Sequence, residues 1–412
     1  MTIVLLTHAF PPDPAAVGQH MADLAGVLAK RGHRVVVITS DRGYDDASIR
    51  FARTETTPDG VQIHRLAQTS FGKATLFHRA IGIASFMAQS AVAAARMQNL
   101  EGIVYSTSPP FIGVIATVIG KLRGVPTAFW AMDLNPDQLV ALGKLRPSSV
   151  LTRMMRAVNR FTLQRAAVVV ALDQLMAARL AAQGAEADRL VVIPPWSPDE
   201  QLRAVPRAEN AFRARYGLTD CIVVMYSGNH TQSNPLTTLL AAAEALRDVS
   251  HLKFVFVGGG NAKHEIEELI SRGNLRNSLC LPYQPKSDLA ASLSAADVHV
   301  VSLGAQMAGV IHPCKVYGAM AVGRPILYLG PSPSHVSAII DECGNGWNVQ
   351  HGNVDCAVTR LRRIAASRYD ELDEIGARGR TLMNTRFQPA ALVNTVANAI
   401  DRAFAIKSGA GL

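Results

Sequence analysis

The sequence predicts an α/β protein with two Rossmann-like domains, whose parallel sheets face a central cleft. The chain has 412 residues, and domains usually hold about 100–200, so two domains are expected. Short apolar segments alternate with longer segments of helical periodicity in both halves, which is the pattern of parallel βαβ units. The alternation is interrupted once, at residues 194–211, where four prolines in a polar stretch indicate a linker.

In the first half, residues 2–7 and 34–39 are the first two predicted strands, and a helix over residues 18–31 joins them. Gly32 follows this helix, at the place where a left-handed helix stop is expected. The remaining predictions for this half are a helix over residues 73–98 and strands over residues 61–66, 102–106, 125–131, 167–172 and 190–193.

The alternation restarts in the second half, and we expect domains at residues 1–196 and 197–388. The final helix, within residues 389–412, is expected to pack back on the first domain. The predicted strands of the second half lie at residues 221–228, 252–260, 279–281, 298–302 and 325–329, and its helices at residues 235–247, 262–272 and 389–406.

Cysteine usage and hydropathy exclude several classes of protein. Five cysteines are present, all in the second half, and no two form a C-x-x-C pair. This predicts neither a disulfide framework nor a zinc site, and it favours a reduced, cytoplasmic protein. No basic segment with a cleavage site precedes the first predicted strand, so we expect no signal peptide. The longest apolar stretch, near residues 80–95, is broken by polar residues, so a membrane-spanning helix of roughly 20 apolar residues is not expected.

Positive charge is concentrated in the first half. Residues 1–195 hold 20 Lys and Arg against 13 Asp and Glu, whereas the remainder holds 21 against 19. Residues 60–100 and 138–172 contain no acidic residue but carry four and six basic ones. Such stretches attract anionic lipid head groups, although a solvated basic surface explains the same charge. Nucleic acid is a disfavoured partner, because no binding motif is recognisable and the aromatic content is 6%.

Candidate site residues of the first half lie in loops after strands, because ligands of open parallel sheets bind beyond the carboxyl ends of the strands. Gly18 can approach a phosphate at a helix start, although a glycine there is more often a turn residue. Asp133 can accept a proton from an attacking hydroxyl, or it can cap a helix start instead. Ser106 and Thr107 follow another strand and are expected on the acceptor side together with Asp133.

In the second half, the loop after the first strand contains Gly228, Asn229 and His230. Gly228 and Asn229 suit a tight turn that faces a phosphate, and His230 can contact an anion or carry a proton. A surface position explains His230 equally well. The glycines at residues 258–260 lack the G-x-G-x-x-G spacing, so we expect a packed turn near the cleft and not a dinucleotide site.

The segment at residues 310–327 is the most informative of the second half. Pro313 lies at a plausible helix start, and Lys315 follows in its first turn. Backbone N–H groups and Lys315 would form a cation-rich cradle for a diphosphate. Fixed donors of this kind stabilise a departing nucleoside diphosphate without a metal. No D-x-D triplet is present, so no metal site is expected.

Taken in order, these segments resemble glycosyltransferase family 4, which has the GT-B fold. The resemblance covers nearly the full length, from residues 8–40, through STSPP at residues 106–110 and DLNPD at residues 133–137, to residues 384–393. It points to the branch that builds capsule, O-antigen and exopolysaccharide repeat units.

The resemblance implies a retaining transfer from a nucleoside-diphosphate sugar, with UDP as the expected nucleotide and no further cofactor. It implies a lipid-linked sugar, a polyprenyl-phosphate carrier or another saccharide as acceptor, at the inner face of the cytoplasmic membrane. The second domain would hold the donor, and the first would dock on the membrane peripherally. The catalytic candidates are then Asp133, Lys315 and His230. The donor-binding candidates are Gly18, Gly228, Asn229, His230, Tyr283, Gln284, His312, Pro313, Cys314 and Lys315, of which Tyr283 and Gln284 would meet the base.

Two features depart from the family pattern. Many members carry an E-x7-E pair, but the matching positions here are Val310 and Gly318. Many also carry Arg and Lys in the loop that here offers only Asn229 and His230, so Lys315 is expected to supply the charge. Arg324 is a weaker candidate for the same role. These gaps leave open a non-catalytic, membrane-associated partner of another glycosyltransferase as an alternative. A nucleotide-sugar epimerase of the same fold is a second alternative, against which the basic first half argues.

Overall fold

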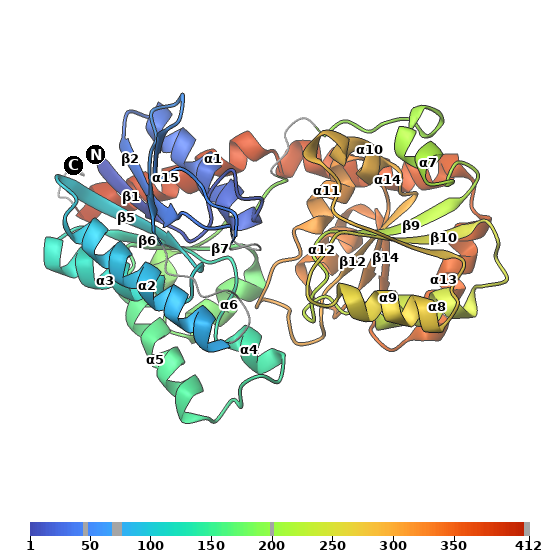
Figure 1. Cartoon of the computed structure of the whole chain (residues 1–412), viewed down its shortest axis with the longest axis horizontal. Helices are drawn as coiled ribbons and strands as arrows, with labels where there is room; N and C mark the ends of the chain where they lie inside the picture. The colour runs from blue at the N-terminus through green and yellow to red at the C-terminus, as the bar shows by residue number, and fades with distance from the viewer. Residues whose placement is uncertain (44–47, 68–75, 198–201, 408–412) are drawn as a thin grey trace. The chain divides into compact units, whose positions relative to one another are not determined.

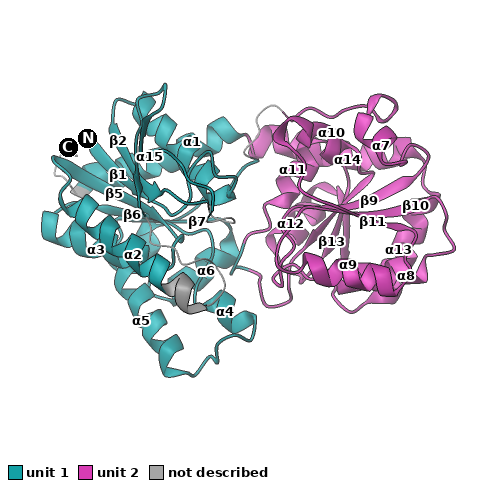
Figure 2. Cartoon of the chain, in the orientation of Figure 1, with its two compact units in different colours: residues 1–198, 309–311, 389–412 teal, residues 199–308, 312–388 magenta. Residues whose placement is uncertain are grey.

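The structure, a computed structural model, describes residues 1–43, 48–67, 76–197 and 202–407. The chain divides into two compact units (Figure 2). The sequence places domain boundaries at residues 196 and 388, close to this division, but it does not foresee that residues 309–311 belong to unit 1. Unit 1 comprises Met1–Pro198, Gly309–Ile311 and Pro389–Leu412, and unit 2 comprises Asp199–Ala308 and His312–Gln388.

Unit 1 is built on a sheet of eight strands in the order β3-β4-β2-β1-β5-β6-β7-β8. Its neighbouring strands pair in parallel, except that β3 and β4 are antiparallel. Strands β1 and β7 are buried along their whole length, as expected for strands covered on both faces. The strands are β1 (Thr2–Leu6), β2 (Arg34–Ser40), β3 (Thr54–Thr56), β4 (Gln62–Leu66), β5 (Leu100–Ser106), β6 (Thr127–Trp130), β7 (Val168–Ala171) and β8 (Leu190–Val192).

Helices cover both faces of this sheet (Figure 1). Helices α1 and α15 pack together on one face, and α2, α3 and α5 form a contiguous layer on the other. The helices of unit 1 are α1 (Ala16–Lys30), α2 (Leu76–Ala95), α3 (Ile112–Arg123), α4 (Asp137–Ala141), α5 (Val150–Leu163), α6 (Gln174–Ala182), the short helix η1 (Ala187–Arg189) and α15 (Pro389–Lys407).

The C-terminal helix α15 belongs to unit 1 and packs on it. Phe404 is fully buried against Gly102 of β5, where a Cβ would lie 2.2 Å from the Phe404 ring. Only glycine at that position leaves room for the ring. Arg31 adds an ion pair with Asp401 at 2.8 Å, which fixes the end of α1 to α15.

Unit 2 contains a sheet of six parallel strands in the order β11-β10-β9-β12-β13-β14. Helices α8, α9 and α13 contribute to the core on one face of the sheet, and α7 lies on the other face. The strands are β9 (Ile222–Ser227), β10 (Leu252–Val257), β11 (Ser278–Leu281), β12 (Val298–Ser302), β13 (Ile326–Leu329) and β14 (Gly346–Val349). The helices are η2 (Arg207–Glu209), α7 (Ala211–Arg215), α8 (Thr237–Ala245), α9 (Lys263–Arg272), η3 (Lys286–Asp288), α10 (Leu289–Ser294), α11 (Lys315–Ala321), α12 (His335–Cys343), α13 (Val354–Ala366) and α14 (Tyr369–Arg386).

Every predicted strand is present, with bounds that differ by a few residues. Gly32 has a φ of +85°, the left-handed stop that was expected. The first residues of the helix predicted over 73–98 lie outside the described part. The sequence missed the edge strands β3 and β14, whose residues are largely exposed or half-buried and show no apolar alternation. Within the part of the chain that the structure describes, no helix combines the length and apolarity needed to cross a bilayer.

Candidate functional site

The candidate residues form two groups, one within each unit. Unit 2 holds the donor candidates except Gly18, and unit 1 holds Gly18, Ser106, Thr107 and Asp133.

In unit 2, the loop after β9 is packed against the glycine turn at residues 258–260. A Cβ on Gly258 would lie 2.1 Å from the carbonyl oxygen of Gly228. A Cβ on Gly260 would lie 2.1 Å from Oδ1 of Asn229. Gly258 and Gly228 have φ values of +127° and +132°, where side chains are strained. The turn thus packs backbone against backbone at this loop.

Lys315, the first residue of α11, lies against the same loop. A Cβ on Gly228 would be 2.6 Å from Cε of Lys315, so glycine makes room for the lysine stem. Its Nζ lies 5.1 Å from the centre of the Tyr226 ring, in cation–π geometry. Burial lowers the pKa of Lys315 to about 8. The ammonium is therefore charged at neutral pH but poorly solvated, and it would gain strongly from an anionic ligand.

His230 is 1% exposed and lies beside Tyr226, with ring centres 4.8 Å apart. Burial, followed by the charge of Lys263, lowers the pKa of His230 to about 4, so the ring is neutral at pH 7. Its Nδ1 is 3.1 Å from the carbonyl oxygen of Gly259, which can only accept a hydrogen bond. The proton is therefore on Nδ1, and Nε2 is an acceptor. Nε2 has no hydrogen-bond partner among the described residues.

Tyr283 and Gln284 lie after β11, beside the same turn. A Cβ on Gly259 would be 2.9 Å from Cε2 of Tyr283. Tyr283 is 54% exposed, so an accessible aromatic side chain lies next to the glycine turn. Gln284 is partly exposed, and its amide donates to the carbonyl of Pro282 at 2.9 Å.

The residues that precede α11 are tied to α12 through a chain of rings. Nε2 of His312 is 2.9 Å from the Tyr317 hydroxyl, which is 3.0 Å from Nε2 of His335. The thiol of Cys314 donates to the carbonyl of His312 at 3.5 Å. Pro313 is buried between them. These contacts fix the backbone that leads into Lys315.

The structure places Arg324 and the two positions where many family members carry glutamate. Arg324 is 6% exposed and forms an ion pair with Asp373, so it stabilises unit 2. Val310 is buried, and its carbonyl accepts the N–H of Leu134 at 2.9 Å in unit 1. Gly318 lies in α11, where a Cβ would meet Leu293 at an ordinary 3.5 Å.

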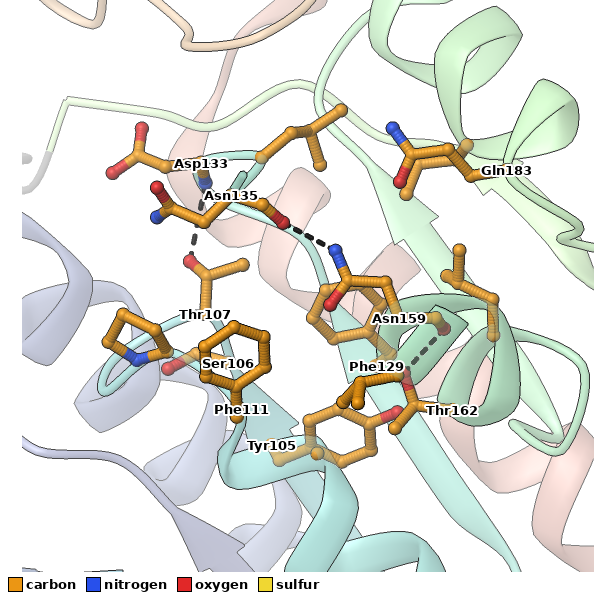
Figure 3. Close-up of a pocket in the computed structure, with 16 residues that line it drawn as sticks. Tyr105, Ser106, Thr107, Phe111, Phe129, Asp133, Asn135, Asn159, Thr162 and Gln183 are labelled. Carbon is orange, nitrogen blue, oxygen red and sulfur yellow. Dashed lines mark hydrogen bonds between the residues drawn. The ribbon is translucent and has the colours of Figure 1, made fainter. Parts of the chain in front are cut away.

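In unit 1, a cavity of about 50 Å³ lies beyond the carboxyl ends of β5 and β6. Ser106, Thr107 and Asp133 all line it, so the structure brings together the three residues predicted for the acceptor side. In Figure 3, Thr107, Asp133 and Asn135 lie on one side of the cavity, and Tyr105 lies on the other. The full lining is Tyr105, Ser106, Thr107, Pro110, Phe111, Gly113, Phe129, Asp133, Leu134, Asn135, Val158, Asn159, Thr162, Leu163, Leu180 and Gln183.

Asp133 is held by backbone contacts and not by a cation. Its N–H donates to Oγ1 of Thr107 at 3.2 Å, and its backbone forms an antiparallel bridge with Ile311. Burial raises the pKa of Asp133 to about 6. It caps no helix, because α4 begins at Asp137 and has Pro136 as its N-cap. A carboxyl group with this pKa can exchange a proton near neutral pH.

Gly18 lies inside α1, not at its first residue. A Cβ there would be 3.0 Å from the carbonyl carbon and oxygen of Ala9. Glycine is therefore needed for α1 to approach the chain that follows β1, which is a packing role. Its role toward a donor stays a prediction.

Sequence reasoning missed three residues of these sites. Tyr226 lies under Lys315, and its only signal was its place near the end of β9. Lys263 donates to the carbonyls of Phe256 and Leu281 at 2.6 and 3.2 Å, and it lowers the pKa of His230 through its charge. Phe111 lines the unit 1 cavity with no signal in the sequence, because its conformation depends on tertiary packing.

The chain matches two protein families. Residues 15–196 match the family described as Glycosyl transferase 4-like domain, and residues 221–367 match Glycosyl transferases group 1. These two ranges fall in units 1 and 2 respectively, apart from the residues 309–311.

Two relatives are described as glycosyltransferases. The putative colanic acid biosynthesis glycosyl transferase WcaI of Escherichia coli K12 is 25% identical over 336 residues, which are 78% of this chain and 82% of WcaI. The probable glycosyltransferase WbjE of Pseudomonas aeruginosa is 27% identical over 258 residues, which are 61% of this chain and 63% of WbjE.

Solved structures share the fold over almost the whole chain. Sucrose-phosphate synthase from Thermosynechococcus elongatus superposes with a TM-score of 0.76 at 18% identity, covering 98% of this chain and all of that one. Anabaena HepE in complex with UDP-glucose gives 0.73 at 15% identity, with coverage of 98% and 100%.

Proposed function

Because the chain belongs to the family 4 glycosyltransferases of the GT-B fold, we propose that it transfers a sugar from a UDP-sugar to a lipid-linked saccharide in surface polysaccharide biosynthesis. The description of WcaI supports the pathway, that of WbjE supports the transferase activity, and the UDP-glucose bound to HepE supports the nucleotide. The resemblance to family 4 supports retention of the anomeric configuration.

The observation that carries this proposal is the convergence of Gly228, His230 and Lys315 at one loop of unit 2. Lys315 is a poorly solvated cation, and the glycines let its stem and the turn at residues 258–260 pack closely against this loop. A bound diphosphate would restore the electrostatic stabilisation that the Lys315 ammonium loses through burial. Tyr283, which is 54% exposed beside Gly259, offers an aromatic ring on which the base can stack.

In the proposed reaction, a hydroxyl oxygen of the acceptor bonds to C1 of the donor sugar. The bond between C1 and the phosphate oxygen breaks, and UDP leaves with the electron pair. Lys315 stabilises the negative charge that develops on the leaving oxygen. No metal is required, because the chain supplies this cation itself.

His230 serves the donor as a hydrogen-bond acceptor. A neutral ring with Nδ1 bound to Gly259 can accept a hydroxyl proton at Nε2, but it cannot donate to a phosphate. We therefore assign His230 to a hydroxyl of the sugar or ribose. Asp133 of unit 1 accepts the proton of the attacking hydroxyl, for which a pKa of about 6 is suitable.

Helix α5 provides the membrane surface of the proposal. Its first turns expose Val150, Leu151 and Met154 by 64%, 54% and 61%, and Arg153 is exposed beside them. Apolar side chains among cations suit the interface of an anionic bilayer.

Replacing Val150 and Leu151 by Ser should weaken co-sedimentation with vesicles of phosphatidylglycerol. Leu122→Ser is the matched control, because Leu122 is 79% exposed on α3, and equal loss in both variants would reject α5 as the docking surface.

A thermal-shift panel of UDP, ADP, GDP and their glucose conjugates tests the donor assignment. A ligand at 100 times its dissociation constant stabilises the fold by about 2.7 kcal/mol. UDP compounds should raise Tm, and Lys315→Ala should remove the shift while Lys253→Ala, a lysine of β10, retains it. A shift with ADP or GDP and none with UDP would overturn the assignment of UDP. Binding without any transfer to membrane lipid extracts would favour a non-catalytic partner.

A further inference from the structure

The cavity beside Asp133 is lined by neutral groups. Asp133 is the one carboxylic acid among its described lining residues, and none of them is Lys, Arg or His. The polar groups of the lining are the hydroxyls of Ser106 and Thr107 and the amides of Asn135 and Gln183, among others. A buried phosphate needs cations or many fixed donors, and it would be repelled by the Asp133 carboxylate. The cavity is therefore unsuited to a phosphate.

The deeper wall of the cavity is aromatic. The rings of Tyr105 and Phe129 are stacked with centres 5.0 Å apart and planes at 17°. Gly113 makes this possible, because a Cβ there would lie 2.6 Å from the Tyr105 ring. Asn159 donates to the carbonyl of Asn135 and thereby fixes the loop that carries Asp133 (Figure 3).

Phe111 has a backbone conformation that a side chain of its size rarely adopts. Its φ is +69° at the residue before α3, in the left-handed region that favours glycine. Such strain persists where the surrounding structure enforces it, and it is frequent at functional sites. Here the conformation presents the Phe111 ring to the same cavity as Thr107 and Asp133. An aromatic ring beside hydroxyl, amide and carboxyl groups matches a sugar, which has an apolar C–H face and a polar edge.

The volume limits what can enter. One water molecule needs about 10–15 Å³ of cavity volume. The cavity of about 50 Å³ therefore admits a group of roughly three to five heavy atoms. A hydroxymethyl or acetamido substituent fits this size, whereas a whole sugar ring does not.

We propose that this cavity is an acceptor subsite, which takes an uncharged substituent of a sugar and so directs a sugar hydroxyl, not a lipid phosphate, to Asp133. The inference rests on the transferase function proposed above. Phe111 is then a specificity-determining residue for the acceptor sugar. An earlier glycosyl transfer must therefore place a sugar on the lipid carrier, and this protein then extends it.

Ligand-observed NMR on the full chain, saturated with UDP, tests this subsite. The probes are methyl glycosides of the common hexoses and N-acetylhexosamines, with farnesyl phosphate as the phosphate-bearing alternative. We expect at least one glycoside to receive saturation transfer, and Phe111→Ala to weaken its binding roughly tenfold. Phe161→Ala is the matched control, because Phe161 is a half-buried ring of unit 1 that does not line the cavity.

The outcomes separate the two proposals. If UDP binds but no glycoside does, or if Phe111→Ala weakens farnesyl phosphate and spares the glycosides, the subsite is wrong and the transferase proposal stands. If UDP itself does not bind, the proposed donor site fails independently of this cavity. Asn135→Ala provides a second variant in case Phe111→Ala does not fold, and it should weaken the same glycoside.

Discussion

The candidate sites of unit 2 and unit 1 differ in charge and in the chemical groups that form them. The unit 2 site is cationic and consists of closely packed glycine backbone, with the charges of Lys315 and Lys263 near His230. The unit 1 site is a neutral cavity of aromatic and amide side chains, with a carboxyl group at its rim. The contrast fits a transfer in which one partner leaves as an anion and the other arrives as a neutral hydroxyl. Substitutions can test the residues of each site separately.

Removing the cation of unit 2 should have the largest effect. Lys315→Ala should lower kcat about 10²- to 10³-fold, the usual loss when one fixed donor to a developing charge is removed. Steady-state kinetics with a UDP-sugar measures this, and Lys253→Ala should be unaffected. A Lys315→Ala enzyme with full turnover would show that the leaving group is stabilised elsewhere.

Closing the glycine turn of unit 2 should come next. Gly258→Ala places a Cβ 2.1 Å from the Gly228 carbonyl at a φ of +127°, so we expect a loss of roughly 2–3 kcal/mol in the free energy of unfolding. Gly352→Ala is the matched control, since its φ is +83° and no atom lies within 4 Å of the added Cβ. Chemical denaturation compares them, and equal losses would mean that backbone strain alone explains both.

The pH dependence should divide between the two units. If Asp133 accepts the hydroxyl proton, kcat/KM should fall about tenfold for each pH unit below pH 6. Asp133→Asn should lose activity, and the remaining activity should no longer fall on the acidic side of the profile. Above pH 8, Lys315 loses its charge and UDP affinity should fall, whereas Lys315→Arg should keep its affinity if the larger side chain fits. A kcat/KM profile that is flat between pH 5 and 7 would remove Asp133 from the mechanism.

The pKa shifts of Asp133 and His230 have opposite consequences for how the free energy of unfolding depends on pH. The fold raises the pKa of Asp133 from 3.8 to about 6. The protonated carboxyl group therefore adds to the free energy of unfolding below pH 4, and this contribution is lost as pH rises through 6. It lowers the pKa of His230 from 6.5 to about 4, so that contribution is present above pH 6.5 and is lost as pH falls through 4.

The smallest predicted effect concerns the strained rim of the unit 1 cavity. Phe111→Gly and Phe111→Ala both lose the ring, but only glycine relieves the left-handed backbone. We expect Phe111→Gly to be more stable than Phe111→Ala by about 1 kcal/mol, measured by denaturation. Equal stability would show that the φ of +69° is not maintained in the folded protein.

Prediction from sequence succeeded where a local pattern corresponds to a local structure. The alternation of apolar and helical segments located every predicted strand, and the position of strand ends brought Thr107 and Asp133 to one cavity. Lys315 and Gly228 were placed in one site by the same rule, and they are in contact. The exposed edge strands β3 and β14 have no such pattern and were missed.

The sequence by itself determined the two α/β units, the order of their elements and the loops that carry candidate chemistry, because hydrophobic periodicity and turn residues act over short distances. Only the tertiary structure decided the state of those residues. The neutral ring of His230, the depressed pKa of Lys315 and the raised pKa of Asp133 come from burial among distant segments. The left-handed Phe111 likewise depends on packing around one cavity. Desolvation and packing are sums over neighbours that the chain acquires only when it folds.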